Sequence, residues 1–555
     1  MSHDVLIIGS GPAGVHAAYP LVKAGKRVCM VDGGYEAPPM LYDPPRGTYD
    51  DVRRQEPDQY RWFLGEDLSN IPLGGLAGGH GGGMAHGNRA YVTAGTEEFL
   101  PLKLSSAQII QSLAQGGLGA VWGAACAFIL DHELTAMGLN SSEMQKHYRT
   151  VSERIGVSGP QIHPEIDPPL QPDHHAEHFL KAYRRKEKCF RKEHLSIVQP
   201  HSAVLTRDKG SRKAHSYSDM DYFADAGRSV YRPQYTLQEL QAFPNFQYAD
   251  KELVERIIEK DDGVEVHSTS IKNGTRGTKN AFKGNRVILA AGAIGTARIL
   301  LRSFNLFDTP LPLIAKPHAF IAALHGRSLG ASGPAERCSL CQLLLLDEER
   351  HASGLESACA QIYSYKSLQL FRLLGSIPLP IPEAMSLLAL LAPSLNVIDI
   401  RFPGLSDAGK TLTLRKDAGG DRVHIHLGVS EEEQRSRHTA LKRIKRGLRM
   451  LGAMPLRTMM LPEGSSSHYG GTVPFQSQPG KFPFSVNAEG KLHQGRQIYV
   501  ADASVFLALS AKPFTLTIMA NANRIGEHVL MSLAAASPHT EGEGAGKVQR
   551  QPVQQ

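Results

Sequence analysis

The hydrophobic pattern of the first 32 residues predicts a strand, a turn, a helix and a second strand. Residues 4–8 form a short apolar run, which is typical of a buried strand. Residues 15–24 then carry apolar side chains at helical spacing, and residues 26–31 predict a second strand that ends at Asp32. Between the first strand and the helix, residues 9–14 complete the pattern G-x-G-x-x-G.

This glycine turn has the spacing of a dinucleotide-binding turn. Gly9 allows the tight turn, Gly11 lets a pyrophosphate approach the backbone, and Gly14 lets the helix pack on the strand. The first N–H groups of the helix and its dipole would face the phosphates. Asp32 stands 18 residues after Gly14, where a carboxylate accepts hydrogen bonds from an adenosine ribose. A glycine turn with a purely structural role is the alternative.

Apolar runs followed by turns or helical spacing recur further along the chain. Residues 253–259 and 264–266 predict a strand hairpin around the turn at 261–263. The further predicted elements are a helix at 141–155 capped by Gly156, a buried strand at 286–291, a turn at 292–295, a helix at 296–301, a strand at 498–504 and a helix at 515–530. Strands and helices alternate in these segments, which indicates an α/β protein.

Length and charge favour a multidomain globular protein. The chain has 555 residues, 41% of them hydrophobic and 21% charged, with a formal net charge of +7. The densest basic run, 184–186, is followed by Glu187 and Glu193, which favours a solvated helix face over a polyanion site. We therefore expect no nucleic-acid partner.

The cysteines and histidines do not predict a metal site. Six scattered cysteines are too few for a disulfide framework, and Cys338 and Cys341 form a single C-x-x-C with no second pair. A redox dithiol there is an open alternative. His80 and His86 have no companion ligand at a recognisable spacing. Because the chain goes directly into the nucleotide strand with no signal peptide before it, we expect a cytoplasmic protein.

Three further segments have unusual composition. Residues 373–392 are apolar but are broken by three prolines and Glu383, so we expect a buried or pocket-lining segment. A flap over an apolar substrate, or a membrane-surface contact, is the alternative. Residues 74–95 are dense in glycine and predict a loop near a cofactor or a lid, and residues 536–555 predict a disordered tail.

Four separated blocks make the chain resemble the glucose–methanol–choline (GMC) family of FAD-dependent oxidoreductases. They span most of residues 4–532 and occur in the family's order. They are the glycine turn at 9–14, the glycine loop at 116–122, the strand and turn at 287–295, and a C-terminal group formed by 467–472, 500–506 and 513–520. The loop at 116–122 and the helix at 143–157 resemble the pyranose oxidase and gluconate dehydrogenase branch most.

The resemblance implies an α/β fold in which a Rossmann-like FAD-binding domain is interleaved with a substrate-binding domain built on an antiparallel sheet. The FAD-binding domain would comprise residues 1–160, 251–304 and 461–535, the last also catalytic, and the substrate domain residues 161–250 and 305–460; the tail is 536–555.

The resemblance also implies the residues that contact FAD. Val254 would bind the adenine through its backbone, and Asp502, at the start of the last helix, would lie by the pyrophosphate or ribityl chain. The implied contacts are Gly9, Gly11, Pro12, Ala13, Gly14, Asp32, Gly116, Gly117, Val121, Trp122, Val254, Ala291, Gly292, Asp502, Ala503, Pro513, Phe514 and Thr515. Where that branch carries the histidine that bonds covalently to flavin, this chain has Val121, so we expect non-covalent FAD.

Two residues are predicted to be catalytic. His468 occupies the family's H-x-x-G-T position, and a neutral imidazole there would take the proton from an alcohol hydroxyl. Lys512 stands before Pro513, where the family has His or Asn. Its ammonium would stabilise an alkoxide or reduced flavin, or lower the pKa of His468. A structural lysine, or a loop shift that puts another side chain in its place, is the alternative.

These observations favour an FAD-dependent oxidoreductase that oxidises the CH–OH group of a sugar, polyol or related alcohol, with an unspecified electron acceptor. One alternative is a flavoenzyme that acts on an apolar, steroid- or lipid-like substrate. The other is a flavin-binding subunit or degenerate homologue that lacks alcohol oxidation. A small-molecule alcohol is the expected partner, and no membrane contact is expected.

Overall fold

The computed structural model describes residues 2–37, 91–217, 225, 227–272, 274–328, 340–364, 378–407 and 409–535. Several sequence predictions lie outside these residues. They are the predictions for residues 74–90 with His80 and His86, for Cys338 and so for the C-x-x-C pair, for residues 373–377, and for the tail at 536–555.

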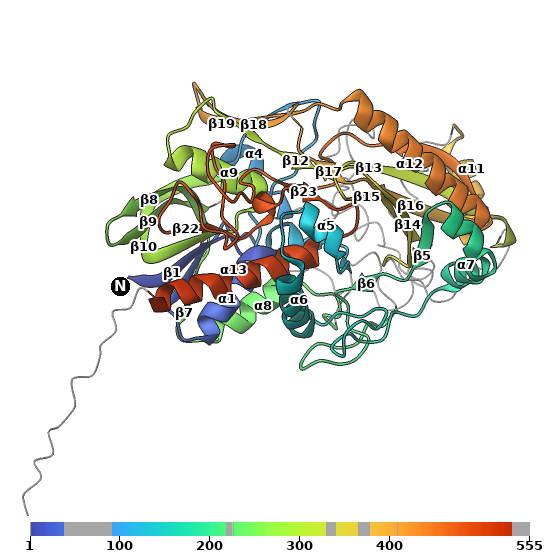
Figure 1. The fold of residues 1–555 in the computed structure, drawn as a ribbon, viewed down its shortest axis with the longest axis horizontal. Coiled ribbons are helices and arrows are strands. Elements are labelled where there is room, and N and C mark those ends of the chain that lie inside the picture. Colours follow the sequence, from blue (N-terminus) through green and yellow to red (C-terminus); the bar gives the residue numbers. More distant parts are fainter. Residues whose placement is uncertain are drawn as a thin grey trace, which may run out of the picture.

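A parallel sheet forms the first half of the molecule (Figure 1). In the described part of the chain its order is β7 (Phe246–Ala249), β2 (Val28–Val31), β1 (His3–Ile8), the end of β10 (Thr275–Leu289), and β22 (Ile498–Val500). These strands are short and apolar because both faces of a parallel sheet are covered. The predicted strand–turn–helix–strand succession and the mixed α/β class are confirmed.

β10 is much longer than the predicted strand at 286–291. Its first half pairs antiparallel with β9 (Gly263–Lys272), which pairs with β8 (Glu252–Lys260) in the predicted hairpin. The hydrophobic pattern did not predict residues 275–285 because this half of β10 is largely exposed and its side chains are mostly polar. Such an antiparallel extension needs no apolar face on its solvent side.

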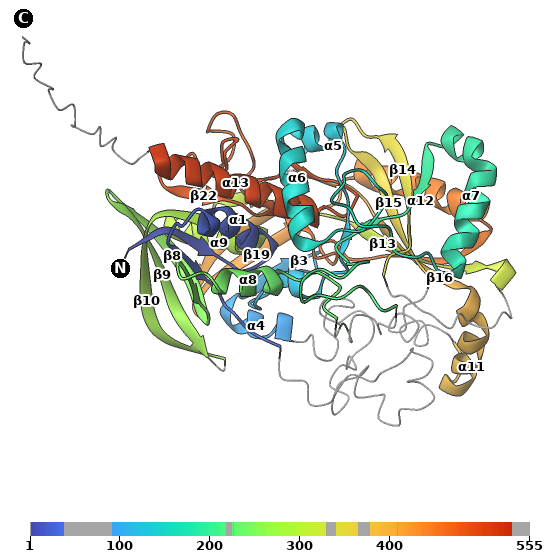
Figure 2. The same ribbon diagram turned by 90° about the horizontal axis from the view of Figure 1, so that it is seen from below.

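Helices cover the parallel sheet on both faces (Figures 1 and 2). α1 (Pro12–Lys23) packs closely against α13 (Thr515–Ala535), so the two ends of the described chain meet. α9 (Gly292–Ser303) packs near β8, and α6 (Ser141–Ile155) crosses α13. Gly156 caps α6 with a φ of 77°, as predicted.

An antiparallel sheet forms the other half of the molecule, as expected for the substrate part. Its order among the described residues is β20 (Ala453–Met460), β13 (His318–His325), β16 (Leu395–Arg401), β15 (Glu356–Tyr363), β14 (Leu343–Arg350) and β5 (Leu195–Val198). α12 (Glu431–Met450) and α7 (His174–Lys192) cover one face and share a separate apolar core with it. Every strand pairing in this sheet is antiparallel.

The expected domain boundaries differ from the sheets in two places. β7 lies in the segment 161–250 but pairs with β2 in the nucleotide sheet, and α8 (Pro233–Gln241), which precedes it, packs on α1. A four-stranded sheet of β11 (Pro310–Pro312), β18 (Lys410–Asp417), β19 (Gly420–Leu427) and β3 (Leu102–Ser105) takes three of its strands from the segment 305–460. Its apolar side chains belong to the core of the first half. Domain boundaries predicted along the sequence place these strands with their sequence neighbours, whereas strand pairing joins segments that are distant in sequence.

Short elements complete the description. They are α4 (Thr96–Phe99), η3 (Gly117–Val121), β4 (Ala125–Cys126), α5 (Asp131–Ala136), β6 (His201–Ser202), β12 (Ile314–Ala315), η4 (Gly326–Ser328), α11 (Ile381–Leu391), η5 (Ala392–Ser394), β17 (Gly404–Leu405), β21 (Tyr469–Gly470), η6 (Ala503–Val505) and β23 (Ala508–Leu509). α11 lies at the far end of the antiparallel half (Figure 2). It exposes 37% of Leu387 and 61% of Leu390, so the expectation of a buried or pocket-lining segment does not hold for these two side chains.

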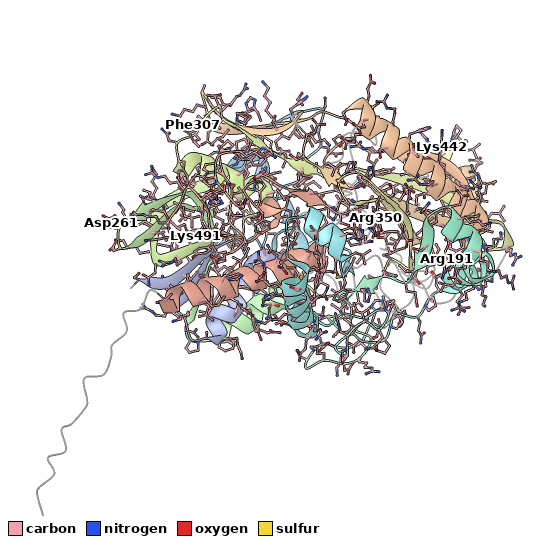
Figure 3. All side chains as sticks on the ribbon, viewed as in Figure 1. Arg191, Asp261, Phe307, Arg350, Lys442 and Lys491 are labelled. Atoms are coloured by element: carbon pink, nitrogen blue, oxygen red, sulfur yellow. The ribbon has the colours of Figure 1, made fainter. Side chains whose placement is uncertain are left out.

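Several charged side chains labelled in Figure 3 lie at the periphery of the molecule. Asp261 stands at the turn of the β8–β9 hairpin, and Lys442 lies on the outer face of α12. Arg191, which follows the basic run 184–186 predicted to be a solvated helix face, is exposed on α7 and pairs with Glu187. Among the helices described, we find none that combines the length and apolar character of a membrane span.

The contact between α1 and α13 depends on Gly526. A Cβ at this position would lie 2.4 Å from the Ala17 carbonyl oxygen, so Gly526→Ala must push the two helices apart. We expect a loss of about 1–3 kcal/mol in the free energy of unfolding, measured by chemical denaturation. Gly326→Ala is the control, because no atom lies within 4 Å of its added Cβ. Equal stability of the two variants would contradict the prediction.

Candidate flavin and active site

The glycine turn has the close contacts that its spacing predicts. Gly9 has a φ of 100°, and a Cβ there would lie 2.6 Å from the carbonyl oxygen of Ala290. A Cβ on Gly14 would lie 1.8 Å from the carbonyl oxygen of Gly9, so only glycine lets α1 start so close to β1. Gly11 differs from both, because the nearest atom to its added Cβ is the Gly116 carbonyl oxygen at 3.9 Å. Gly11 therefore faces open space rather than packed backbone.

The start of α1 fits a bound phosphate. Gly11 is the N-cap, Pro12 occupies the first turn, and no side chain caps the free N–H groups there. The second predicted glycine loop lies against this turn: a Cβ on Gly117 would be 3.5 Å from the Cα of Gly11. The Gly116 N–H donates to the Ser10 hydroxyl at 2.9 Å. Uncapped N–H groups beside two glycine loops have the donor set and the room that a pyrophosphate needs.

Asp32 lies beside this turn, at the end of β2. Its carboxylate accepts hydrogen bonds from the Ser10 hydroxyl at 2.5 Å, the Tyr248 hydroxyl at 2.8 Å and the Ser10 N–H at 3.3 Å. Burial raises its pKa, although these hydrogen bonds oppose the shift. The Asp32 carbonyl accepts from the Glu252 N–H at 2.9 Å, which brings the start of β8, and so Val254, to the same side. A ribose and adenine site here fits both predicted residues.

The ends of β10 and β22 adjoin the glycine turn. Ala291 and Gly292 form the turn into α9, where Gly292 has a φ of 74° and no atom within 4 Å of an added Cβ. Asp502 follows β22 and accepts hydrogen bonds from Thr296 on α9 at 2.6 Å and from the Ser504 N–H at 2.9 Å. The prediction that Asp502 starts the last helix is wrong, because it caps η6, which begins at Ala503, and α13 begins later, at Thr515.

Val121 ends η3, and Trp122 follows it directly. Val121 is buried in a small apolar cluster with Val92, Ala114 and Ala120. The Trp122 indole N–H donates to the Tyr231 carbonyl at 2.7 Å, which fixes the end of the loop. The side chain at position 121 is thus a packed aliphatic group with no atom able to bond to flavin.

His468 lies in the loop before β21 with its tautomer fixed. Its Nδ1 lies 2.6 Å from the Ser466 carbonyl oxygen, which can only accept, so Nδ1 carries the proton. Nε2 is then left with a free lone pair, and no group among the described residues hydrogen-bonds to it. Its ring is partly exposed and packs 5.5 Å from the ring of Phe514. This is the form that a general base must have.

The surroundings keep His468 neutral. Desolvation lowers its pKa well below the usual value, and the positive charges of Lys316 and Arg401 lower it further. Neither cation was predicted from the sequence. The Lys316 N–H donates to the His468 carbonyl at 3.0 Å, and Arg401 reaches the Ser466 carbonyl at 3.4 Å and pairs with Asp399 at 2.6 Å. The repulsion that the sequence assigned to Lys512 is therefore supplied by other residues.

Lys512 is held between two buried carboxylates. Its Nζ lies 2.8 Å from an oxygen of Glu133 on α5 and 2.8 Å from an oxygen of Glu356 on β15. Desolvation would lower the pKa of Lys512, but the two carboxylates outweigh it and raise the pKa. Burial raises the pKa of Glu356. The ammonium is therefore fully charged and locally neutralised, which favours the structural role over the catalytic one.

The same carboxylates belong to a group with metal-ligand spacing. Within the described residues, His132, Glu133 and Glu356 are the one set whose ligand atoms all lie within 4.8 Å of one another. The Lys512 ammonium already contacts both carboxylates, and a divalent ion there would be repelled by it. The cluster is best described as an ion-pair network.

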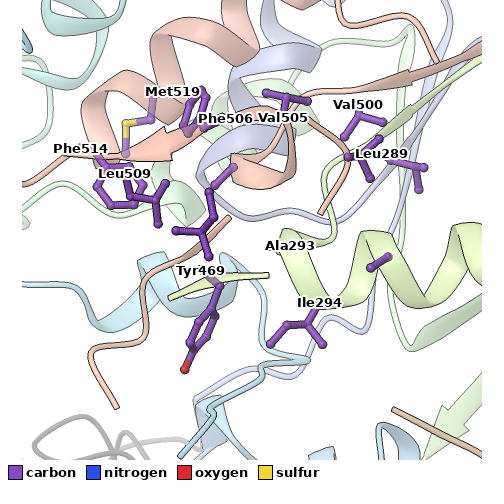
Figure 4. Close-up of a cluster of buried hydrophobic side chains, with 14 of the residues drawn as sticks. Leu289, Ala293, Ile294, Tyr469, Val500, Val505, Phe506, Leu509, Phe514 and Met519 are labelled. Carbon is purple, nitrogen blue, oxygen red and sulfur yellow. The ribbon is translucent and has the colours of Figure 1, made fainter. Parts of the chain in front are cut away.

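The start of α13 completes the site (Figure 4). Pro513 and Phe514 lead into the helix at Thr515, and Phe514 is buried beside Phe506, with ring centroids 6.4 Å apart. Phe514, Leu509 and Met519 gather at one end of this cluster, and Ala293 and Ile294 of α9 lie at another. The structure thus brings His468 next to Phe514, and it keeps the Lys512 side chain in its ion-pair network.

The comparisons with known proteins agree with the nucleotide site. Residues 2–39 match the family model described as "FAD binding domain". No curated protein matches the sequence significantly. Among solved structures, pyridoxine 4-oxidase from Mesorbium loti matches over 95% of this chain and 99% of its own, with a TM-score of 0.54 and 13% sequence identity. The family match supports an FAD site at β1 and α1, and the structural match supports the fold.

Proposed function

We propose that this protein is an FAD-dependent oxidoreductase of the GMC type that oxidises an alcohol CH–OH group with His468 as the base. The observation that carries the proposal is the His468 ring, whose proton is held on Nδ1 by Ser466 while Nε2 is left as a free acceptor beside Phe514. The four sequence blocks, the FAD binding domain match and the shared fold support it.

The residues that would hold FAD follow the strands β1 and β2 or lie in the glycine loop before η3. Gly11, Gly116 and the first turn of α1 would bind the pyrophosphate, and Asp32 would bind the adenosine ribose. Bound FAD would accept the hydride that leaves the substrate carbon. Because Val121 offers no nucleophile, we propose that the cofactor is held without a covalent bond.

His468 would remove the hydroxyl proton. A neutral imidazole at pH 7 can accept it at Nε2, and the carbonyl of Ser466 stabilises the imidazolium by keeping its hydrogen bond to Nδ1. Because its pKa is held below the usual value, His468 stays a base into the mildly acidic range. The low pKa also makes it ready to release the proton again after each turnover.

For the substrate we propose a sugar, polyol or related small alcohol, of the kind used by the pyranose oxidase and gluconate dehydrogenase branch. The structural neighbour is named for oxidation of pyridoxine, which is also a small hydroxylated molecule. An apolar substrate is the second candidate, and the exposed leucines of α11 favour it. Tight binding of an apolar ligand, with no flavin reduction by polyols, would select the second candidate.

His468→Ala should abolish alcohol-dependent flavin reduction while FAD stays bound. Removal of a general base costs about 10²–10⁴-fold in rate. Anaerobic stopped-flow absorbance at the flavin band measures the rate, and the flavin-to-protein absorbance ratio measures binding. His493→Ala is the control, since this partly buried ring hydrogen-bonds the Gln476 carbonyl at 3.0 Å. Unchanged reduction in His468→Ala would remove the proposed base.

Denaturation should release the flavin. We expect acid-precipitated protein to leave the yellow cofactor in the supernatant, with a visible spectrum of free FAD, because position 121 is valine. A flavin that stays with the precipitate would show a covalent bond at another residue. A colourless protein that takes up no added FAD would favour the degenerate homologue.

Lys512→Met should lower the free energy of unfolding by about 3–5 kcal/mol, because it leaves Glu133 and Glu356 buried without a counter-charge. Adding Glu133→Gln and Glu356→Gln should restore most of the loss. Lys146→Met is the matched control: its pair with Glu527 is solvent-exposed, so we expect a loss of about 1 kcal/mol or less.

Chemical denaturation measures these stabilities, and flavin reduction by alcohol measures the role in catalysis. The triple variant combines Lys512→Met, Glu133→Gln and Glu356→Gln. If it folds and binds FAD but its rate of flavin reduction falls about 100-fold or more, Lys512 acts in catalysis as well.

A further inference from the structure

Lys316 connects the His468 loop to the start of α13. Its backbone is held from both sides by the loop: its N–H donates to the His468 carbonyl at 3.0 Å, and the Ser466 hydroxyl donates to its carbonyl at 2.5 Å. Its side chain extends the other way, and Nζ donates to the Lys512 carbonyl at 2.7 Å. One residue thus contacts both segments that the sequence predicts to be catalytic.

The amine of Lys316 is deeply buried and has a single hydrogen-bond partner. Only 1% of the residue is exposed, and the Lys512 carbonyl is the one acceptor of Nζ among the described residues. An ammonium has three donors, so it would leave two of them without partners, whereas a neutral amine fits this site better. Nζ also lies 5.1 Å from the centroid of the Phe514 ring, against which the His468 ring packs.

Charged groups on several elements face this amine. Burial and, to a smaller extent, the positive charge of Arg401 lower the pKa of Lys316 to about 7, and three acidic groups oppose this shift. Arg401 is itself paired with Asp399, whose second neighbour is His318 at 3.6 Å. The acidic groups that face Lys316 are Cys359 on β15, Asp399 on β16 and Glu133 on α5. The Lys512 ammonium is neutralised by its own carboxylates, so Lys316 and the paired Arg401 are the cations that act on His468.

We propose that Lys316 is a positioning residue for His468: it fixes the His468 loop against the Lys512–Pro513 turn, and its amine sets the acid limit below which His468 stops acting as a base. This inference rests on the proposed function. Below neutral pH the amine is an ammonium, and its charge opposes a second positive charge on the neighbouring imidazole. Above neutral pH it is mostly an uncharged amine, and His468 is neutral as well.

The test measures the titration of His468 directly. Holoenzyme labelled with carbon-13 at histidine Cε1 is titrated by NMR, and the His468 signal is assigned by its loss in His468→Asn. Lys316→Met and Lys316→Gln should each raise the pKa of His468 by about one pH unit or more. Where an alcohol reduces the flavin, the acid limb of the reduction rate should move up by the same amount.

Conservative and matched variants separate this role from packing. Lys316→Arg keeps a permanent charge and should keep the pKa of His468 low. Lys410→Met removes another fully buried lysine, which is paired with Glu433, and should leave the His468 titration unchanged. An unchanged His468 titration in Lys316→Met and Lys316→Gln, or a rise in Lys316→Arg equal to that in Lys316→Met, would overturn the proposal.

If the variants fail to fold, the proposal can still be tested on the unmodified holoenzyme. The His468 signal should show a second, smaller step near pH 7 as Lys316 titrates, and its absence would overturn the proposal. Failure of the proposed function has a different signature, since no alcohol would then reduce the flavin even though His468 still responds to Lys316. The two failures are therefore distinguishable.

Discussion

The parallel pairing of β10 with β1 on one side and β22 on the other is the constraint on which the site depends. Ile8 pairs with Leu289, and Leu289 pairs with Val500, so three segments far apart in sequence end at the same edge of the sheet. Parallel strands present their carboxyl ends together, and ligands of open α/β sheets bind at that edge. The glycine turn, the Ala291–Gly292 turn and Asp502 are neighbours for this reason.

Buried charge is organised in pairs around His468. The Lys512 ammonium lies between two carboxylates and Arg401 is bound by Asp399, so each of these charges has a local partner. Among the described residues Lys316 has no ion-pair partner, and of these three cations it is the one whose pKa is lowered to about 7, chiefly by burial. In a site of low dielectric a single unpaired amine has a larger effect on a neighbouring imidazole than several paired charges.

The parts of the site that could be predicted from sequence are those formed by local geometry. The turn at Gly9, Gly11 and Gly14 was predictable because its steric contacts lie within one strand and one helix, apart from the approach of Ala290. The hairpin of β8 and β9 and the cap at Gly156 were predictable for the same reason. His468 was predicted from a short pattern in its own loop, and the structure adds the tautomer.

The rest required contacts between distant segments. Glu133 and Glu356 lie far from Lys512 in sequence, and nothing in their own neighbourhoods distinguishes them from surface carboxylates. The length of β10 was missed because its exposed half is polar. The sequence offers one signal for Lys316: it directly follows the two apolar residues of β12. Charged residues are rare next to buried strands.

The position before Pro513 shows how the fold separates charge from catalysis. If the Lys512 side chain turned toward the active site, Glu133 and Glu356 would stay buried without a counter-ion. The free-energy cost of those two charges exceeds the gain from one contact with an alkoxide. The backbone carbonyl of Lys512 takes no part in the ion pairs, and it accepts the hydrogen bond from the Lys316 amine. The side chain therefore stabilises the wall of the site, while the carbonyl fixes an amine that acts on His468. Under the proposed function, the electrostatic role expected of Lys512 therefore belongs to Lys316.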